Sequence, residues 1–462
     1  MKRILSIIAT IHILLLSSCD FSLEEYPYTS GGNMTSYPAG ASQMVNSIYN
    51  VFWSSGLMKK SYMETIDMDH DHAAAPSWVV SGAGEGNITT HWSYNTPSDP
   101  FNAFYMLINR ANYAVENLPQ VEGLDSVSES QCMGEARFLR AFAYFHLVRM
   151  YGGVPLRLSS SISSDMERAS VMQVYNQIEE DLLYASTALP EKTDNSNWGS
   201  ANLRNTEFVW GVSGNSQTEY ITNHLGFYYS AIPYNGRAWA GMSEHAFALY
   251  RDGDERGEHG IFHYVKQTFT ATSAYVRIPD DAQKYPTGPD GRPSRAVADY
   301  YNIYFPTKWY LGDVVNPQPV TTEPGYSYQA QDVILIRFVD AYLLRAEALN
   351  ELGDAAGALD DLDVVRKRAK AALFERFTTD KTTIRSLVLE ERSMEFMQEF
   401  NRKFDLLRWG LYLKVMNSVG SVRVQGTGVT ITKTREPRST LYAVPLNELN
   451  INKKFGPNNP GW

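Results

Sequence analysis

One segment in the first third of the chain constrains the fold most, because it forms a helix that other helices must cover. Residues 131–156 read QCMGEARFLRAFAYFHLVRMYGGVPL, with apolar side chains at three- and four-residue spacing. Gly152-Gly153 ends the predicted helix, and Pro155 prevents it from resuming. Arg140 and His146 fall between the apolar positions. The face that we expect to pack inward consists of Phe138, Ala141, Phe142, Phe145 and Val148.

A second helical pattern follows much later in the chain. Residues 333–368 predict two helices joined at Leu352-Gly353-Asp354. Small and apolar residues in this stretch follow much of the spacing of a tetratricopeptide hairpin, in which small residues let two helices approach closely. These residues are Tyr342, Ala346, Leu349, Gly353, Ala358 and Leu362. Because neither helical unit can bury its apolar face alone, we expect a mainly α scaffold of tetratricopeptide-like hairpins.

The remaining elements follow from the same spacing arguments. The expected further helices are 39–53, 101–118, 171–189, 384–400 and 402–415. Strand-like sequence is expected at 422–434 and 441–446. Between 193 and 331 glycine, proline, asparagine and aromatic residues are dense, and we expect long irregular loops with short strands such as 261–265 and 304–310. Long connections of this kind inside a compact protein are usually functional.

Composition excludes two classes of protein. Apolar residues make up 44% and charged residues 20% of the chain, which is typical of a globular protein and not of a disordered one. The net charge is −10, and the only basic block is Arg366-Lys367-Arg368. Nucleic-acid binding through counterion release needs clustered Lys and Arg. We therefore expect no nucleic-acid partner.

The N-terminus has the features of an export signal. A positive pair at 2–3 precedes the apolar run 4–16, which is too short to span a bilayer as a stable anchor. Small residues directly before Cys19 resemble the lipobox of bacterial lipoproteins, in which the cysteine is acylated and becomes the new N-terminus. We expect lipidation at Cys19; the alternative is a plain secretory signal with an incidental cysteine. Several acyl chains would hold a soluble domain on a membrane.

The densest group of potential metal ligands is the run 67–72, DMDHDH. Its spacing matches no defined metal site, and a tight loop cannot turn all of these groups inward. We therefore interpret it as a solvated acidic loop and expect no metal and no cofactor. The run 252–255, DGDE, is weaker as a calcium loop because it lacks the spacing of an EF-hand. A structural calcium ion is an alternative that nothing in the sequence supports.

Sequence motifs of catalysis are missing, and the aromatic residues suggest binding instead. The chain carries no nucleophile elbow, H-E-x-x-H, Walker loop or G-x-G-x-x-G. A flat aromatic ring can pack on the C–H face of a sugar, and each such contact contributes on the order of 1 kcal/mol, by analogy with aromatic pairs. For each such residue, packing in the core is the alternative. The ligand-binding candidates, chosen near Gly, Pro or Asn outside helical periodicity, are Trp78, Trp92, Trp239, Trp309 and Tyr310.

Most of the chain resembles the SusD/RagB lipoproteins of the Bacteroidetes outer membrane, and its segments follow the order of that family. The matching segments are the lipobox at 16–19, FNAFYMLINRANYAVENLPQV at 101–121, GEARFLRAFAYFHLVRMYGGVPL at 134–156, VYNQIEEDLLYASTALP at 174–190, the hairpin at 333–368, EERSMEFMQEFNRKFDLLRWG at 390–410 and AVPLNELNINKKFGPNNPGW at 443–462. The domain organisation expected from this resemblance is a signal peptide at 1–18, a lipidated tether at 19–38, an N-terminal helical part at 39–230 and a C-terminal part at 231–462, the last two forming one compact unit.

The resemblance implies a lipid-anchored protein on the outer-membrane surface that binds glycans, or in some members peptides, without catalysis. It also implies a partner, a SusC-like TonB-dependent transporter that receives the captured ligand. One departure concerns residues 193–207, which lead almost directly from a helix into strand-like sequence where the family usually has another helical hairpin. A lipid-anchored glycan hydrolase that uses carboxylates not identifiable from the sequence remains the alternative function.

Overall fold

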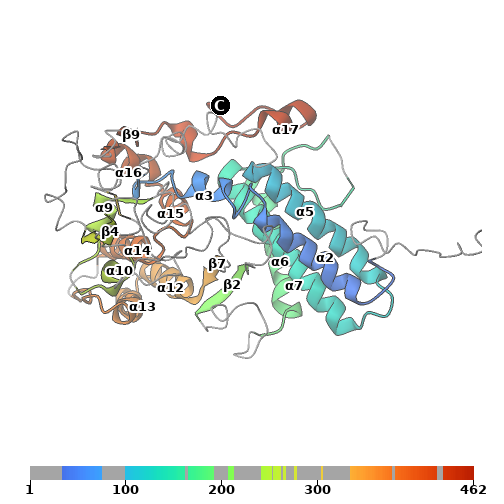
Figure 1. The fold of residues 1–462 in the computed structure, drawn as a ribbon, viewed down its shortest axis with the longest axis horizontal. Helices are drawn as coiled ribbons and strands as arrows, with labels where there is room; N and C mark the ends of the chain where they lie inside the picture. Colours follow the sequence, from blue (N-terminus) through green and yellow to red (C-terminus); the bar gives the residue numbers. More distant parts are fainter. Residues whose placement is uncertain are drawn as a thin grey trace, which may run out of the picture.

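The computed structural model is mainly helical, with its helices grouped in two halves on either side of a short two-stranded sheet (Figure 1). The strands of that sheet are β2 (Phe208–Val212) and β7 (Val333–Arg337), which run antiparallel. The mainly α scaffold is therefore confirmed. The structure describes residues 34–74, 99–161, 165–191, 207–212, 241–251, 253–261, 264–266, 275–277, 303–304, 333–376, 380–423 and 430–462.

The N-terminal half is a helical group in which one long helix is covered by three others (Figure 1). Its helices are α2 (Ala39–Tyr49), α5 (Pro100–Asn117), α6 (Ser126–Tyr151) and α7 (Val171–Ala188). Helix α6 contacts α2, α5 and α7. The helices predicted at 39–53, 101–118 and 171–189 are confirmed, with the end of the first in a 3₁₀ turn at Asn50–Trp53. Short helix α3 (Ser61–Ile66) follows α2.

Both ends of α6 are set by local chemistry. The Asp125 carboxylate accepts hydrogen bonds from the backbone N–H groups of Val127 and Ser128, at 3.0 and 2.9 Å, which caps the N-terminus. At the other end Gly152 has φ of +73°, and a Cβ there would lie 3.2 Å from Leu441 Cδ1. The predicted stop at this glycine is confirmed, because a residue with a side chain would be strained in that conformation.

The predicted face of α6 is wrong in one respect, because the helix is buried on more than one side. Phe145 is 37% exposed, whereas Arg140 and His146 are only 5% and 7% exposed. The Arg140 guanidinium donates to both carboxylate oxygens of Asp181, at 2.8 and 2.7 Å, and to Asn112 Oδ1 at 2.8 Å. The pairing with α7 and α5 compensates the burial of this charge.

The C-terminal half contains the second predicted hairpin. Its helices are α12 (Phe338–Leu352), α13 (Ala355–Arg368), α14 (Lys381–Glu395), α15 (Arg402–Arg408) and α16 (Tyr412–Val419). Helix α17 (Leu446–Ile451) lies above α5, beside the N-terminal half (Figure 1). Gly353, at φ +90°, ends α12, and Asp354 caps α13 by accepting from Gly357 N–H at 2.9 Å. Ala346, Ala358 and Leu362 are fully buried between the helices. The hairpin and its turn are confirmed.

Four boundaries in the C-terminal part of the chain differ from the prediction. Residues 333–337 form strand β7, because β2 supplies a pairing edge that the sequence alone does not reveal. The helix predicted at 402–415 is two helices, since Gly410 at φ +67° separates α15 from α16. Residues 441–446 are not a strand, and α17 begins at Leu446. At 384–400 the helix ends at Glu395, and a turn with positive φ at Gln398 and Phe400 follows.

The strands form small antiparallel sheets. Besides β2–β7, the pairings join β1 (Ala73–Ala74) to β3 (Gly241–Ser243), β3 to β6 (Ile303–Tyr304), β4 (Tyr264–Lys266) to β5 (Tyr275–Arg277), and β8 (Ser421–Arg423) to β9 (Thr430–Thr432). Within β2, the Trp210 ring packs edge-on against Phe52 and Phe142, with centroids 5.7 and 4.9 Å apart. Because its partner β7 continues into α12, the β2–β7 sheet connects the two halves.

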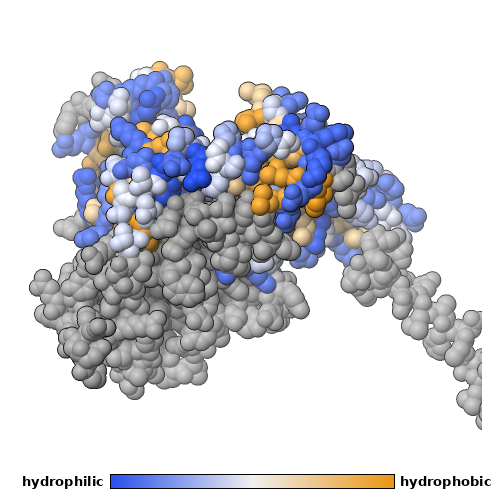
Figure 2. All heavy atoms as spheres, turned by 90° about the horizontal axis from the view of Figure 1, so that it is seen from above, coloured by the Kyte–Doolittle hydropathy of each residue, from blue (hydrophilic) through white to orange (hydrophobic). Residues whose placement is uncertain are grey.

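The end of the chain returns to the N-terminal half. Tyr442 N–H donates to Met150 O at 2.7 Å, and the Asn459 amide donates to Tyr151 O and Tyr442 O at 3.0 and 2.7 Å. In Figure 1 this segment runs from the side of α16 to the end of α5. Figure 2 looks onto this face; the residues coloured there are mostly hydrophilic, with separate groups of apolar residues among them. No helix within the described ranges combines the length and the apolar character that crossing a membrane requires.

Candidate functional site

The residues chosen from the sequence as ligand contacts lie outside the described part of the chain. This holds for Trp78, Trp92, Trp239, Trp309 and Tyr310, and also for the lipidation candidate Cys19. Their roles therefore stay predictions. The geometry of a candidate site comes instead from a pocket that the sequence analysis did not identify.

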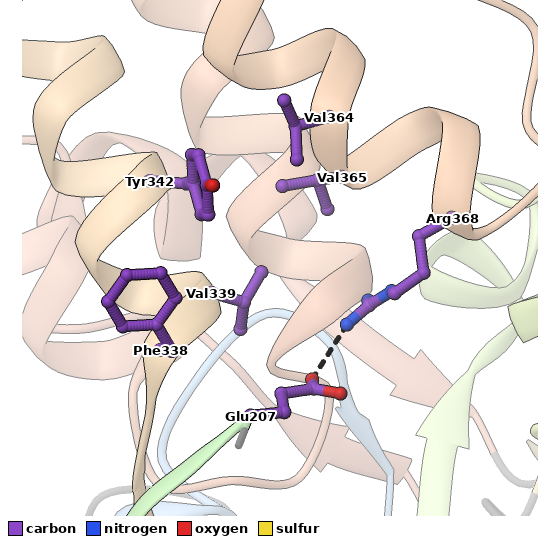
Figure 3. Close-up of a pocket in the computed structure, with 7 residues that line it drawn as sticks. All are labelled: Glu207, Phe338, Val339, Tyr342, Val364, Val365 and Arg368. Carbon is purple, nitrogen blue, oxygen red and sulfur yellow. Dashed lines mark hydrogen bonds and ion pairs between the residues drawn. The ribbon is translucent and has the colours of Figure 1, made fainter.

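This pocket lies where the β2–β7 sheet meets the hairpin of α12 and α13 (Figure 3). Its volume is approximately 560 Å³. The backbone positions its lower edge, because Phe338 N–H donates to Glu207 O at 2.7 Å and so holds the start of β2 against the start of α12. The lining residues are Glu207, Phe338, Val339, Tyr342, Val364, Val365 and Arg368. The volume is within the range of small-molecule sites in proteins.

One wall of the pocket is aromatic. Phe338 and Tyr342 are four residues apart in α12 and therefore lie on the same helix face. Their ring centroids are 5.5 Å apart and the ring planes are nearly perpendicular, at 88°. Phe338 is 51% exposed, although it is a large apolar residue at the centre of a folded segment. An exposed aromatic ring at the edge of a pocket can pack against a flat apolar face of a ligand.

The opposite side of the pocket is charged. The Arg368 guanidinium lies 2.7 Å from Glu207 Oε1, and Figure 3 shows this pair across the pocket from the two rings. Arg337 donates to the same oxygen at 2.8 Å. Burial acts against the charged form of Arg337, but the carboxylates of Glu399 and Glu395 outweigh it and raise the pKa of Arg337 above its ordinary value. The Arg337 guanidinium therefore stays charged, and together with Arg368 it pairs with the Glu207 carboxylate at this edge.

The pocket combines an aromatic wall with an ion-paired carboxylate on the opposite side. Such a combination suits a ring that has C–H groups on one face and hydroxyl groups at its edge, as a sugar has. Glu207 is the only carboxylate among the described lining residues, and two arginines hold it. Hydrolysis of a glycoside usually uses two carboxyl groups flanking the bond.

Part of this pocket could have been predicted from the sequence. The spacing of Phe338 and Tyr342 predicts that both rings share one helix face, but we assigned Tyr342 to packing within the hairpin. Glu207 lies 130 residues before Arg337 and 161 before Arg368. No local pattern reveals a pairing over such a separation.

The acidic run 67–72 is a second candidate from the sequence, and its predicted exposure is wrong. Asp69 and Asp71 are each only 1% exposed. Asp69 accepts from Lys403 Nζ at 2.5 Å and from Arg435 Nε at 2.9 Å. Burial alone would raise the pKa of Asp69, but the charges of Lys403 and Arg435 lower it below its usual value. This carboxylate is therefore an ionised part of the core.

The other members of the run are buried in the same way. Asp71 accepts from Arg402 Nε and Nη2 at 2.9 and 2.7 Å, and Asp67 Oδ1 accepts from Phe400 N–H at 2.9 Å. His70 and His72 are each 2% exposed. The prediction failed because the compensating cations come from residues 402–435, more than 330 positions later in the chain.

The weaker acidic candidate at 252–255 also has a structural role in its described part. The Asp254 carboxylate accepts from Arg256 N–H at 3.0 Å and caps the short helix α10 (Glu255–Glu258). Its second oxygen lies 2.8 Å from Arg256 Nη2. Helix capping and ion pairing account for this carboxylate without a calcium ion.

Two family models together match nearly all of the chain. Residues 206–462 match the model described as the SusD family, and residues 23–201 match one described as starch-binding, associating with the outer membrane. Among curated relatives, SusD-like protein P38 of Formosa agariphila is 25% identical over 485 residues, covering 91% of this chain and 95% of the relative. The starch-binding protein SusD of Bacteroides thetaiotaomicron is 30% identical over 135 residues, covering 29% of this chain and 22% of that protein.

Solved structures share the whole fold. A SusD homologue from Bacteroides thetaiotaomicron superposes with a TM-score of 0.71 at 20% identity, covering 94% of this chain and 98% of that one. A structure described as a laminarin-binding SusD-like protein gives a TM-score of 0.65 at 20% identity, covering 92% and 100%. At these identities the similarity establishes the architecture.

Proposed function

The chain belongs to the SusD family, and on that premise we propose that it is a non-catalytic binding lipoprotein of the cell surface that captures glycans. The observation that supports this most directly is the pocket at the β2–α12 junction, where an exposed phenylalanine ring faces a fixed ion pair. Relatives described as starch-binding and laminarin-binding favour a carbohydrate ligand.

The lipid anchor is the second part of the proposal. Cys19 carries the acyl chains, and residues 19–38 form the tether that holds the folded part at the outer face of the outer membrane. The lipobox-like sequence before Cys19 supports this, and so does the match to a family model described as associating with the outer membrane. Mass spectrometry of the membrane-extracted protein tests it: the N-terminal peptide begins at an acylated Cys19, and Cys19→Ser releases the protein from the membrane.

The captured glycan then passes to a SusC-like TonB-dependent transporter in the same membrane. This step rests on the family resemblance. Trp78, Trp92, Trp239, Trp309 and Tyr310 remain proposed ligand contacts that would add aromatic surfaces to the one in the pocket. A peptide is the second class of ligand that the family resemblance admits, and calorimetry with oligopeptides distinguishes it.

Affinity electrophoresis against a panel that includes starch and laminarin tests glycan capture. We expect retardation by at least one polysaccharide and no new reducing ends in the same mixtures. Phe338→Ala is expected to weaken binding about 3- to 10-fold, which corresponds to the loss of one aromatic contact of about 0.5–1.5 kcal/mol. Leu352→Ala is the matched control, because Leu352 is an apolar residue of α12 that is 84% exposed outside the pocket.

The outcomes separate the alternatives. Steady release of fragments from any polysaccharide would show that the protein is a hydrolase and would contradict the binding proposal. Retardation that Phe338→Ala leaves unchanged would exclude the pocket as the glycan site while keeping glycan capture, and alanine variants of the five aromatic candidates would then locate the site.

A further inference from the structure

Three potential metal ligands meet where the buried acidic run passes the short helix α9 (Glu244–Phe247). Asp71 and His72 directly precede β1, and His245 follows β3, which pairs with β1. Ser243 N–H donates to His72 O at 2.8 Å, which fixes the two segments next to each other. One ligand atom from each of Asp71, His72 and His245 lies within 4.8 Å of the others.

The imidazole groups here lack the hydrogen bonds that buried polar atoms usually have. His72 Nδ1 and both ring nitrogens of His70 are buried without a hydrogen-bond partner, and each residue is 2% exposed. The His72 ring lies 6.2 Å from the His70 ring and 5.9 Å from the His245 ring. The His72 ring is therefore available as a metal ligand, because its Nδ1 has no partner and its Nε2 lies beside the Asp71 carboxylate.

We propose that Asp71, His72 and His245 form a binding site for a divalent transition-metal ion of the Zn²⁺ class. Two imidazoles and one carboxylate are a ligand set that suits Zn²⁺. The Asp71 Oδ2 to His72 Nε2 distance is 3.2 Å. Two ligand atoms at about 2.0–2.1 Å from a tetrahedral zinc ion lie about 3.3 Å apart, so this pair is already spaced for coordination.

The third ligand explains how an ion enters. His245 is exposed, whereas Asp71 and His72 are buried, so the site opens to solvent on the α9 side. Calcium is not expected to bind, because it requires six to eight oxygen ligands and this site has one carboxylate.

The positive charges near the proposed site limit its expected affinity for a metal ion. Arg402 occupies one lone pair on each Asp71 oxygen, and a carboxylate oxygen has two, so each oxygen keeps one for a metal ion. Lys433 Nζ donates to His70 O at 3.0 Å, and this charge also opposes a bound cation. We therefore expect weaker binding than at a structural zinc site made of cysteine thiolates. The bound ion would hold α9 to the segment 67–74.

Thermal unfolding of the mature protein with and without added Zn²⁺ tests the site. We expect Zn²⁺ to raise Tm, since a ligand that binds only the folded state stabilises it, and we expect Ca²⁺ to leave Tm unchanged. His245→Ala is expected to weaken Zn²⁺ binding at least tenfold in a chelator-competition titration. His259→Ala is the matched control, because His259 is also an exposed histidine near a short helix.

A spectroscopic readout adds an independent criterion. Co²⁺ in place of Zn²⁺ is expected to give the d–d absorption of a four-coordinate nitrogen- and oxygen-ligated ion, and His245→Ala is expected to abolish it. Equal Zn²⁺ affinity of the wild type and His245→Ala would overturn the proposal, as would a wild-type protein that shows neither a Tm shift nor the Co²⁺ spectrum. Neither result would affect the glycan-binding proposal, which concerns a different part of the molecule.

Discussion

The two halves of this molecule use similar helices but different interactions to hold them together. The helices of the N-terminal half contribute most members of the large apolar cluster, and the fully buried Phe104, Leu107 and Leu147 are typical. The α12–α13 hairpin and α14 share a much smaller apolar cluster. Around that cluster, buried arginines and carboxylates pair in networks.

The difference is physical as well as compositional. Apolar contacts are non-directional, and their contribution scales with the area removed from water. An ion pair must keep its geometry, and its desolvation cost can match its Coulombic gain. We infer that the N-terminal half provides much of the stability, whereas the C-terminal networks fix the positions of the residues around the candidate pocket. The inference can be tested by removing single interactions from each half.

The largest effect is expected from Glu391→Ala in the C-terminal half. Glu391 is fully buried and accepts from Arg256 Nη1 at 2.7 Å and from Arg366 Nη1 at 2.6 Å. Its loss leaves the buried Arg366 charge without its carboxylate partner, and we expect the free energy of unfolding to fall by about 3–5 kcal/mol in urea titrations. Glu390→Ala is the control, since Glu390 is partly exposed and pairs with Arg251 only at 3.8 Å. A loss below about 1 kcal/mol would contradict this account of the network.

A smaller effect is expected from pH in the N-terminal half, through His146. Burial, with a contribution from the nearby Arg149 charge, lowers the pKa of His146 well below its usual range. In the unfolded chain a histidine binds a proton below about pH 6.5, so this group makes the folded state lose stability as the pH falls below that value. The expected contribution is about 1.4 kcal/mol per pH unit.

His146→Gln isolates that contribution. Glutamine can still accept the hydrogen bond from Tyr62 O–H, which lies 2.6 Å from His146 Nδ1, but it does not titrate. The measurement is the slope of unfolding free energy against pH between 6 and 5, compared with the wild type. An unchanged slope would show that His146 protonates equally in the folded and unfolded states.

The smallest effect is expected at the start of α7. Ser170 and Gln173 form a reciprocal capping box, in which Ser170 N–H donates to Gln173 Oε1 at 2.8 Å and Gln173 N–H donates to Ser170 Oγ at 3.3 Å. Ser170→Ala is expected to cost about 1 kcal/mol of unfolding free energy, measured by urea titration. Ser186→Ala, within the same helix, is expected to be nearly neutral, because the higher helix propensity of alanine offsets the loss of the exposed hydrogen bond from Ser186 Oγ to Leu183 O. If both serines behave alike, the cap does not stabilise α7.

The sequence predicted those parts of the fold that depend on neighbouring residues. The helix expected at 101–118 is α5 at Pro100–Asn117, because Asp99 and Pro100 are an N-cap and a first helical residue. The turn at Gly353 was predicted for the same kind of reason. Strand β7 was missed because its conformation depends on β2, which lies more than 100 residues earlier.

Distant charge pairing explains the error in the acidic run and the failure to find the pocket. The acidic run 67–72 reads as solvated, since burial of so many charges without partners is prohibitive. Its partners Arg402, Lys403 and Arg435 are visible only in the folded structure. The candidate site also depends on both local and distant residues. The spacing of Phe338 and Tyr342 is visible in the sequence, but Glu207 is brought to the pocket by the pairing of β2 with β7.

The return of the C-terminal segment to the first helices has a consequence for folding. Asn452 bonds Met166 N–H across 286 residues, and Asn459 bonds Tyr151 O across 308 residues. Closing loops of that length is slow, and native contacts at such separation form late. The flank of α6 that these contacts cover therefore stays open until residues 452–459 fold back onto it, so closing this flank is a late step of folding.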